Sequence, residues 1–187
     1  MADTYKKSIL DIVLKSSPMP KYRFKSVLDI TAEDFKKMGA EAVALDIDNT
    51  ICNDGKDNCI DGLEDWLKEI QGAGIKVMII SNAIPPRPVK IAQKLSLPCL
   101  CYAKKPLSYK LRNGAKMMGV ETNRLAMVGD QLFADVKAAN GCGAIAVRVD
   151  PLKGETRYPR YYAMRRKKEA AVLEEFEKRH GYGVYDE

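Results

Sequence analysis

The chain has 187 residues, of which 46% are hydrophobic and 30% charged, and its formal net charge is +6. This composition is typical of a soluble globular protein, and the length fits one domain with a full core better than two. No apolar run approaches the roughly 20 residues that a membrane span needs, which argues against an integral membrane protein. We therefore expect a single domain over residues 1–187.

The N-terminal residues and the cysteines indicate a cytoplasmic protein. Asp11 interrupts the apolar residues near the N-terminus, so this stretch is too short and too broken for a secretory signal. The five cysteines are an odd number, and we expect free thiols in a reducing compartment. A zinc site would need further Cys or His ligands near Cys99 and Cys101, and the only histidine is His180.

The positive charge is concentrated at the two ends of the chain. Residues 1–25 and residues 157–180 each carry a net charge of +4, whereas residues 26–156 are balanced. We expect basic extensions over 1–25 and 157–187 that pack on or flank the core. Such ends suit an anionic partner, for example the phospholipids of the inner membrane face, although lysine and arginine also keep small proteins soluble. Binding to nucleic acid is not favoured.

Helices and strands are expected to alternate along most of the chain. The N-terminal part predicts an amphipathic helix over 4–15, a connector over 26–30 and a short helix between Thr31 and Gly39. Continuous apolar runs then predict buried strands, separated by segments with helical spacing or helix start and stop signals. The strands are expected at 42–46, 75–80, 99–103, 125–128 and 144–149, and the helices at 63–72, 85–95, up to 118, 132–140 and 161–179.

This alternation predicts an α/β fold with a doubly wound parallel sheet and helices on both faces. In a parallel sheet the carboxyl ends of the strands lie along one edge, where open α/β folds bind ligands. Polar residues follow four of the five predicted strands, and we expect them to meet at that edge. They are Asp46 and Asp48, Ser81 and Asn82, Lys105, and Asp130 with Asp135.

These residue types suit phosphoryl transfer. Asp46 and Asp48 leave an extended chain on the same side, and they repel each other unless a cation or a proton intervenes. One carboxylate can attack phosphorus and form an acyl phosphate, and a second can protonate the leaving oxygen and then activate water. A hydroxyl, backbone N–H groups and a lysine can hold phosphoryl oxygens, and carboxylates are suitable ligands for Mg²⁺.

The arrangement resembles the haloacid dehalogenase (HAD) superfamily of aspartate-nucleophile phosphatases. Four segments are similar to the four motifs of the family, in the same order: Leu45-Asp46-Ile47-Asp48-Asn49-Thr50, Ser81-Asn82, Lys105-Pro106, and Gly129-Asp130-Gln131 through Asp135. The anchor residues of successive motifs are 35, 24 and 25 residues apart, which fits the family. The resemblance covers residues 23–165 and is greatest to the subfamily IIIA, YqeG-type proteins, which are related to phosphatidylglycerophosphatases.

The resemblance implies the catalytic and metal-binding residues. Asp46 would be the nucleophile, and Asp48 would be the general acid and base. A Mg²⁺ cofactor would be bound by Asp46, by the backbone carbonyl of Asp48 and by Asp130. Thr50 would brace the loop that carries the nucleophile.

The resemblance also implies the residues that hold the phosphoryl group. Ser81 and Lys105 would bind it, with the backbone N–H of Asn82 beside them. Asp135 would position Lys105 or a metal-bound water. Lys104 is the alternative to Lys105, but the proline after Lys105 favours an extended conformation that would hold Lys105 at the end of the strand.

The spacing of the motifs bears on the substrate. Members of the superfamily usually gain selectivity from cap domains inserted after the first or the second motif. Only 30 residues lie between Thr50 and Ser81, and 23 between Ser81 and Lys105, so we expect no substantial cap. An open site accepts large substrates, and together with the basic ends this makes phosphatidylglycerophosphate a candidate substrate. A soluble sugar phosphate or nucleotide is the alternative.

Two non-enzymatic functions are further alternatives. A receiver-like signalling module also combines acidic residues and a lysine on an α/β sheet, but its acceptor aspartate follows the third strand, where this chain has Lys105. A scaffold that binds nucleic acid through basic ends would not need intact catalytic positions. The oligomeric state does not follow from the sequence.

Overall fold

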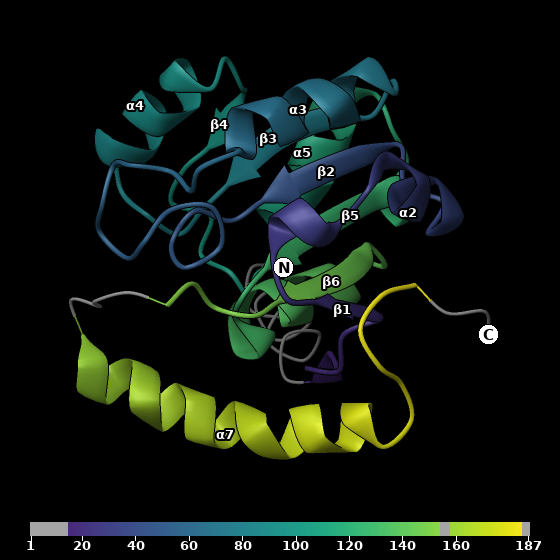
Figure 1. Ribbon diagram of the computed structural model, residues 1–187, viewed down its shortest axis with the longest axis vertical. Coiled ribbons are helices and arrows are strands. Elements are labelled where there is room, and N and C mark those ends of the chain that lie inside the picture. The colour runs from purple at the N-terminus through teal and green to yellow at the C-terminus, as the bar shows by residue number, and fades with distance from the viewer. Residues whose placement is uncertain (1–14, 154–157, 185–187) are drawn as a thin grey trace, which may run out of the picture.

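The computed structural model describes residues 15–153 and 158–184, and its centre is a sheet of six parallel strands (Figure 1). Their order in space is β1-β6-β5-β2-β3-β4, so the direction of winding reverses next to β2. The predicted doubly wound parallel sheet is therefore confirmed. The strands are β1 (Tyr22–Phe24), β2 (Ala42–Leu45), β3 (Lys76–Ile80), β4 (Cys99–Leu100), β5 (Leu125–Gly129) and β6 (Ile145–Val149).

Strand β2 lies at the centre of the sheet. Leu45 is paired with Ile79 of β3 and with Val128 of β5, and all four residues of β2 are buried. A continuous run of small, branched and aliphatic side chains suits this position, because both faces of the strand are covered. The chain leaves β2 at the carboxyl edge of the sheet, at the switch point where open α/β sheets bind ligands.

Helices cover both faces of the sheet. The face with Val43 and Leu45 packs against α2 (Ala32–Lys37), α3 (Leu63–Gly72) and α4 (Arg87–Lys94). The face with Ala42 and Ala44 packs against α5 (Tyr109–Met118), the π-helical turn η3 (Leu132–Val136) and α6 (Lys137–Asn140). Because side chains alternate between the faces of a strand, one short apolar run supplies both halves of the core.

The long helix α7 (Pro159–Glu177) lies on the opposite side of the molecule from α3 and α4 (Figure 1). Its Val172 and Leu173 pack against the same half of the core as α5, and Phe176 is fully buried. After α7 the chain returns to the edge of the sheet, where the N–H of Gly183 donates to the carbonyl of Arg23 at 2.8 Å. The basic C-terminal segment is thus attached to the core by the second half of α7 and by the residues that follow it.

The edge strand β1 was missed in the sequence, and the prediction of five strands was wrong. Tyr22–Phe24 is only three residues long, and Arg23 interrupts its apolar pattern, so no period is visible. Pairing with β6 buries all three residues, and the Arg23 guanidinium is neutralised by Asp150 at 2.9 Å. This strand therefore forms because it pairs with β6, and its own sequence pattern does not predict it.

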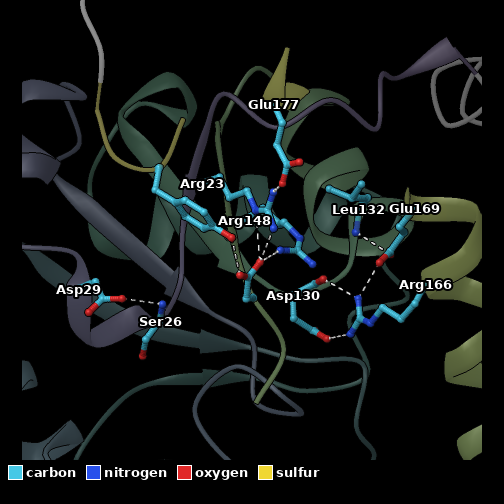
Figure 2. Close-up of polar contacts among 11 residues, drawn as sticks. Arg23, Ser26, Asp29, Asp130, Leu132, Arg148, Arg166, Glu169 and Glu177 are labelled. Carbon is cyan, nitrogen blue, oxygen red and sulfur yellow. Dashed lines mark hydrogen bonds and ion pairs between the residues drawn. The ribbon is translucent and has the colours of Figure 1, made fainter. Parts of the chain in front are cut away.

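The segment before α2 also differs from the expectation. Residues 26–30, expected to be a connector, contain the 3₁₀ turn η1 (Val27–Asp29). Ser26 and Asp29 stabilise it by capping each other's backbone N–H groups, and the bond from Ser26 N to Asp29 appears in Figure 2. The helix predicted over 4–15 lies, except for its last residue, outside the described residues.

The strand predicted over 99–103 is shorter than expected. It ends at Leu100. Tyr102 and Lys104 have φ angles of 48° and 55°, which no β-strand contains. The residues that follow β4 therefore form an irregular segment along the carboxyl edge of the sheet.

No large cap domain interrupts the described part of the chain. Between β2 and β3 lie a loop and α3, and between β3 and β4 lie α4 and short connections. The predicted absence of a substantial cap is confirmed. None of the described helices combines the length and the apolar character that crossing a lipid bilayer requires.

We expect Gly114→Ala in α5 to destabilise the protein. A Cβ atom there would lie 2.8 Å from Met78 Sδ and 2.9 Å from Ile80 Cδ1, and both of these side chains are fully buried. Overpacking should lower the free energy of unfolding by about 1–3 kcal/mol in chemical denaturation. Gly72→Ala is the matched control, since nothing lies within 4 Å of a Cβ at this helical glycine. It should be neutral or stabilising by up to about 1 kcal/mol, and equal losses in both variants would contradict the packing argument.

Candidate active site

The loop after β2 carries the two carboxylates predicted at its end. The backbone carbonyl of Ile47 accepts hydrogen bonds from the N–H groups of residues 50–52, which makes a tight turn. The N–H of Asp46 donates to Val128 O of β5 at 3.0 Å. Asp46 and Asp48 are thereby held at the carboxyl edge of the sheet, and both line one cavity.

Lys105 is the central cation of the site. Its Nζ lies 2.8 Å from Asp46 Oδ1 and 2.6 Å from Asp135 Oδ1, and it donates to Ile80 O at 2.8 Å. The side chain is only 1% exposed. Burial alone would lower the pKa of Lys105, but the carboxylates of Asp135 and Asp46 outweigh burial and raise it. Lys105 therefore stays charged and joins two strand ends.

The side chain of Asn82 holds Lys105 in place. Its Oδ1 accepts from Lys105 N at 2.7 Å, and its Nδ2 donates to Lys105 O at 3.1 Å. Ser81, beside it, is buried and lines the cavity. Lys104 points elsewhere, because its Nζ lies 4.7 Å from the centre of the Tyr102 ring. Of the two lysines, only Lys105 reaches Asp46.

Asp130 and Asp135 come from the segment that follows β5. Asp130 is fully buried, and Asp135 lies in η3 with its Oδ2 accepting from Gln131 N at 3.0 Å. Gly129 makes this approach possible, since a Cβ there would lie 2.4 Å from Asp135 Cγ and Oδ2. The glycine at the end of β5 thus allows Asp135 to reach Lys105.

The sequence analysis missed two residues of α7 at this site, Arg166, which contacts Asp130, and Glu169, which contacts Arg166 (Figure 2). The Arg166 guanidinium pairs with Asp130 Oδ2, and its Nη1 donates to the Asp130 carbonyl at 2.8 Å. Glu169, fully buried, accepts from Arg166 Nη1 at 2.6 Å and from Leu132 N at 2.9 Å. A spacing of three residues puts Arg166 and Glu169 on one helix face, but nothing in the sequence indicates what that face meets.

Arg87 is a third residue that the sequence analysis missed. As the first residue of α4, it places Nη1 2.9 Å from Asp48 Oδ1, which also accepts from Gly55 N at 3.0 Å. Its Nε donates to Lys56 O at 3.1 Å. Arg87 therefore fixes Asp48 against the loop that precedes α3. Its position shortly after Ser81 and Asn82 was the only signal available in the sequence.

Thr50 is not among the predicted residues that line the cavity. It is buried and does not line the cavity, and its hydroxyl makes no hydrogen bond in the described structure. The backbone bonds to Ile47 hold the loop instead. A bracing role for the Thr50 side chain stays a prediction.

Three buried carboxylates form a group that could hold a metal ion. Asp46, Asp130 and Asp135 each offer an oxygen, and these oxygens lie within 4.8 Å of one another. Asp130 Oδ1 is buried and has no hydrogen-bond partner within the described part of the chain. Lys105 and Arg166 supply two positive charges against three negative ones, so a cation beside Asp130 Oδ1 suits the group. The predicted Mg²⁺ ligands Asp46 and Asp130 belong to it, whereas the Asp48 side chain pairs with Arg87.

The electrostatics of this group depend mainly on burial. Burial raises the pKa of Asp46 to about 6, partly offset by Lys105, and raises the pKa of Asp130 to about 8, partly offset by Arg166. The neighbouring carboxylates add to both shifts. A hard divalent cation would favour the ionised forms of both carboxyl groups.

The cavity at this edge of the sheet has a volume of about 430 Å³, within the range of small-molecule sites. Six of the predicted site residues line it: Asp46, Asp48, Ser81, Asn82, Lys105 and Asp135. Arg87 and Arg165 add positive charge, and Tyr161 and Tyr162 of α7 add aromatic surface. The arrangement combines a carboxylate held by a lysine, a second carboxylate held by an arginine, and donors for an anionic group. Such a set supports nucleophilic and acid–base catalysis on an anion.

Comparisons with known sequences point in the same direction. Residues 54–143 match a family model described as a haloacid dehalogenase-like hydrolase. This match contains Ser81, Lys105 and Asp130 but begins after Asp46 and Asp48. The chain is also 29% identical over 140 residues to the probable phosphatase YqeG of Bacillus subtilis (strain 168). That alignment covers 75% of this chain and 81% of the relative.

Solved structures share the fold. An uncharacterized protein from Listeria monocytogenes serotype 4b is 15% identical with a TM-score of 0.50, over 61% of this chain and 83% of that one. The 3-deoxy-D-manno-octulosonate 8-phosphate phosphatase of Moraxella catarrhalis, solved with magnesium and phosphate ions, is 20% identical with a TM-score of 0.46. This match covers 65% of this chain and 75% of that one. At 15% identity the likeness to the Listeria protein concerns the fold alone.

The acidic group makes stability depend on pH when no divalent cation is present. Because the pKa values of Asp46 and Asp130 are raised in the folded state, that state binds more protons than the unfolded chain above about pH 4. The free energy of unfolding should therefore fall between about pH 5 and pH 8, by an amount on the order of a few kcal/mol. Adding Mg²⁺ at pH 8 should restore stability, since the ion binds the ionised carboxylates.

Denaturation in EDTA and in Mg²⁺ across this pH range measures both effects. Asp130→Asn is the control, because it removes the carboxyl group with the larger shift, and it should flatten the pH dependence and weaken the response to Mg²⁺. A wild-type free energy of unfolding that does not change between pH 5 and pH 8 in EDTA would contradict the argument.

Proposed function

We propose that the chain is a phosphatase of the haloacid dehalogenase-like hydrolases, of the YqeG type. On that premise it hydrolyses phosphate monoesters through an aspartyl-phosphate intermediate with Mg²⁺ as cofactor. The observation that carries the proposal is the buried contact of Asp46 with Lys105, at the edge where Ser81 and Asp48 line the same cavity. A nucleophilic carboxylate, a phosphate-binding cation, a hydroxyl and a second carboxylate are thereby within one site.

Asp46 and Asp48 divide the chemistry between them. A carboxylate oxygen of Asp46 attacks phosphorus and forms an acyl phosphate, while the bond from phosphorus to the ester oxygen breaks. Asp48, in its acid form, donates its proton to that leaving oxygen. Asp48 then takes a proton from water, the hydroxide attacks phosphorus, and the acyl phosphate bond breaks to release inorganic phosphate and restore Asp46. Arg87 and Gly55 N support this role by fixing the position of Asp48.

The phosphoryl group is proposed to bind between Ser81, the backbone of Asn82 and Lys105. The Lys105 ammonium is fixed by two carboxylates and a carbonyl, and from this position its charge would stabilise the phosphoryl oxygens. Asp135 positions Lys105 from η3, and the Asn82 side chain does so from the loop after β3. These contacts preorganise the site before substrate arrives.

The metal is proposed to be held by Asp46, the Asp48 carbonyl and Asp130. The unpartnered Oδ1 of Asp130 and the excess negative charge of the buried carboxylates support this assignment. A bound Mg²⁺ would let an anionic nucleophile approach an anionic substrate. Arg166 holds Oδ2 of Asp130, which leaves Oδ1 for the cation.

Phosphatidylglycerophosphate is the substrate that we propose first. A site without a large cap suits a head group on a surface, and the basic ends suit peripheral contact with anionic lipid at the inner face of the membrane. A soluble sugar phosphate or nucleotide is the second candidate, supported by a cavity of about 430 Å³, which accommodates a small ligand. A receiver-like or nucleic-acid-binding role is less well supported, since the catalytic set lines one cavity.

We expect Asp46→Asn to lower phosphate release from 4-nitrophenyl phosphate by at least about 10³-fold, because an amide cannot form the acyl phosphate. Asp65→Asn makes the same change on the exposed surface of α3 and should leave the rate unchanged. A colorimetric phosphate assay in Mg²⁺ measures both variants. Retained activity in Asp46→Asn would exclude Asp46 as the nucleophile.

The lipid assignment has its own test. Wild-type enzyme should hydrolyse short-chain phosphatidylglycerophosphate with a kcat/KM at least about tenfold above that for glucose 6-phosphate or AMP, which corresponds to about 1.4 kcal/mol of selectivity. Equal or lower values for the lipid would favour the soluble substrate instead.

A further inference from the structure

Three basic side chains line the cavity, and two of them are neutralised by carboxylates. Lys105 is paired with Asp46 and Asp135, and Arg87 is paired with Asp48. Arg165 of α7, by contrast, has no carboxylate partner among residues 15–153 and 158–184. Its positive charge is therefore available to a ligand in the cavity.

The Arg165 guanidinium is held in place by one tyrosine. Its Nη1 donates to the Tyr161 hydroxyl, and its Cζ lies 5.4 Å from the centre of the Tyr161 ring. Tyr161 is one helical turn before Arg165, so the two side chains meet on the same face of α7. Stacking and hydrogen bonding restrict the guanidinium without reducing its charge.

The remaining edge of the guanidinium has no partner. Nε and Nη2 of Arg165 are both buried and make no hydrogen bond in the described structure. These two nitrogens form the side of a guanidinium that binds two oxygens of a phosphate or a carboxylate at once. Buried donors without partners are unfavourable, and most native structures satisfy them with protein, water or ligand. An anion in the cavity would satisfy both donors of Arg165.

The phosphoryl group that reacts already has residues assigned to it. The reacting group is assigned to Ser81 and Lys105 on the carboxyl edge of the sheet, whereas Arg165 enters the cavity from α7. A cavity of about 430 Å³ also leaves room for more of the substrate than one phosphoryl group.

We infer that Arg165 binds a second anionic group of the substrate, so that the enzyme selects phosphate monoesters that carry another phosphate or phosphodiester. This inference rests on the proposed phosphatase function and deepens it by naming a residue that determines specificity. The second anion has two possible sources, the phosphodiester of a lipid head group and the second phosphate of a soluble bisphosphate. Both present two oxygens to Nε and Nη2.

The test compares Arg165→Gln with wild type on three probes. They are 4-nitrophenyl phosphate, which has a single anionic group, fructose 1,6-bisphosphate, and short-chain phosphatidylglycerophosphate. The glutamine variant should lower kcat/KM for at least one two-anion probe by about 10–100-fold, mostly through KM, because a charge-assisted bidentate contact is lost. For 4-nitrophenyl phosphate the change should stay below about threefold, since this probe lacks the second anion.

Two further variants sharpen the comparison. Lys167→Gln removes one positive charge from an exposed position of the same helix and should affect no probe, which excludes a general effect of helix charge. Arg165→Lys keeps the charge without the bidentate edge and should lie between wild type and Arg165→Gln. A loss with the lipid only assigns the second anion to a phosphodiester, and a loss with the bisphosphate assigns it to a soluble group.

Equal losses on all three probes, or no loss on either two-anion probe, would overturn the inference. If the wild type hydrolyses none of the probes, the proposed function fails separately, and calorimetry then decides the anion site. Fructose 1,6-bisphosphate should bind the Asp46→Asn variant about tenfold more tightly than the double variant Asp46→Asn/Arg165→Gln, because the double variant lacks the contact with Arg165. Unchanged binding would overturn the inference.

Discussion

The buried contact of Lys105 with Asp46 and Asp135 is the interaction on which the site depends. Without a cation between them, the carboxylates of Asp46 and Asp135 would repel each other at a site where both are almost fully buried. Neighbouring residues hold this contact in place. Gly129 allows Asp135 to approach, and the Asn82 side chain fixes the backbone of Lys105. A charged centre can be buried here because each of its members is anchored by a separate element of the fold.

Helix α7 is the second determinant of the site. Arg166 pairs with Asp130, and Glu169 binds Arg166 together with the start of η3, so the basic C-terminal segment is attached to the acidic group by buried contacts (Figure 2). Tyr161 and Arg165 of the same helix line the cavity. A short chain without a large cap domain thus obtains part of its cavity wall from its last helix. From composition alone, the positive charge of that segment was interpreted as a surface property. In the structure, part of it pairs with buried carboxylates.

Local patterns made most of the fold predictable. The central strands are continuous apolar runs such as Ala42–Leu45, because these strands are buried on both faces. Most of the helices show regular apolar spacing, because a helix is buried on one face, or they end at strong stop signals. The parallel order then placed Asp46, Ser81, Lys105 and Asp130 at one edge without further information. Elements whose stability comes from a distant partner were not predictable. Tyr22–Phe24 is a strand only because β6 lies beside it, and Lys104 and Tyr102 end β4 with positive φ angles.

The sequence by itself therefore determined the parallel sheet and the chemical groups at its carboxyl edge, since strand period and motif spacing are local properties. Only the tertiary structure decided which cation serves which carboxylate. Arg87 is assigned to Asp48, Arg166 to Asp130 and Lys105 to Asp46, whereas Arg165 keeps an edge that no described residue pairs with. The physical reason is that ion pairs between residues far apart in the chain depend on where helices pack against the sheet. The spacing of residues along the chain does not show where a helix packs against the sheet.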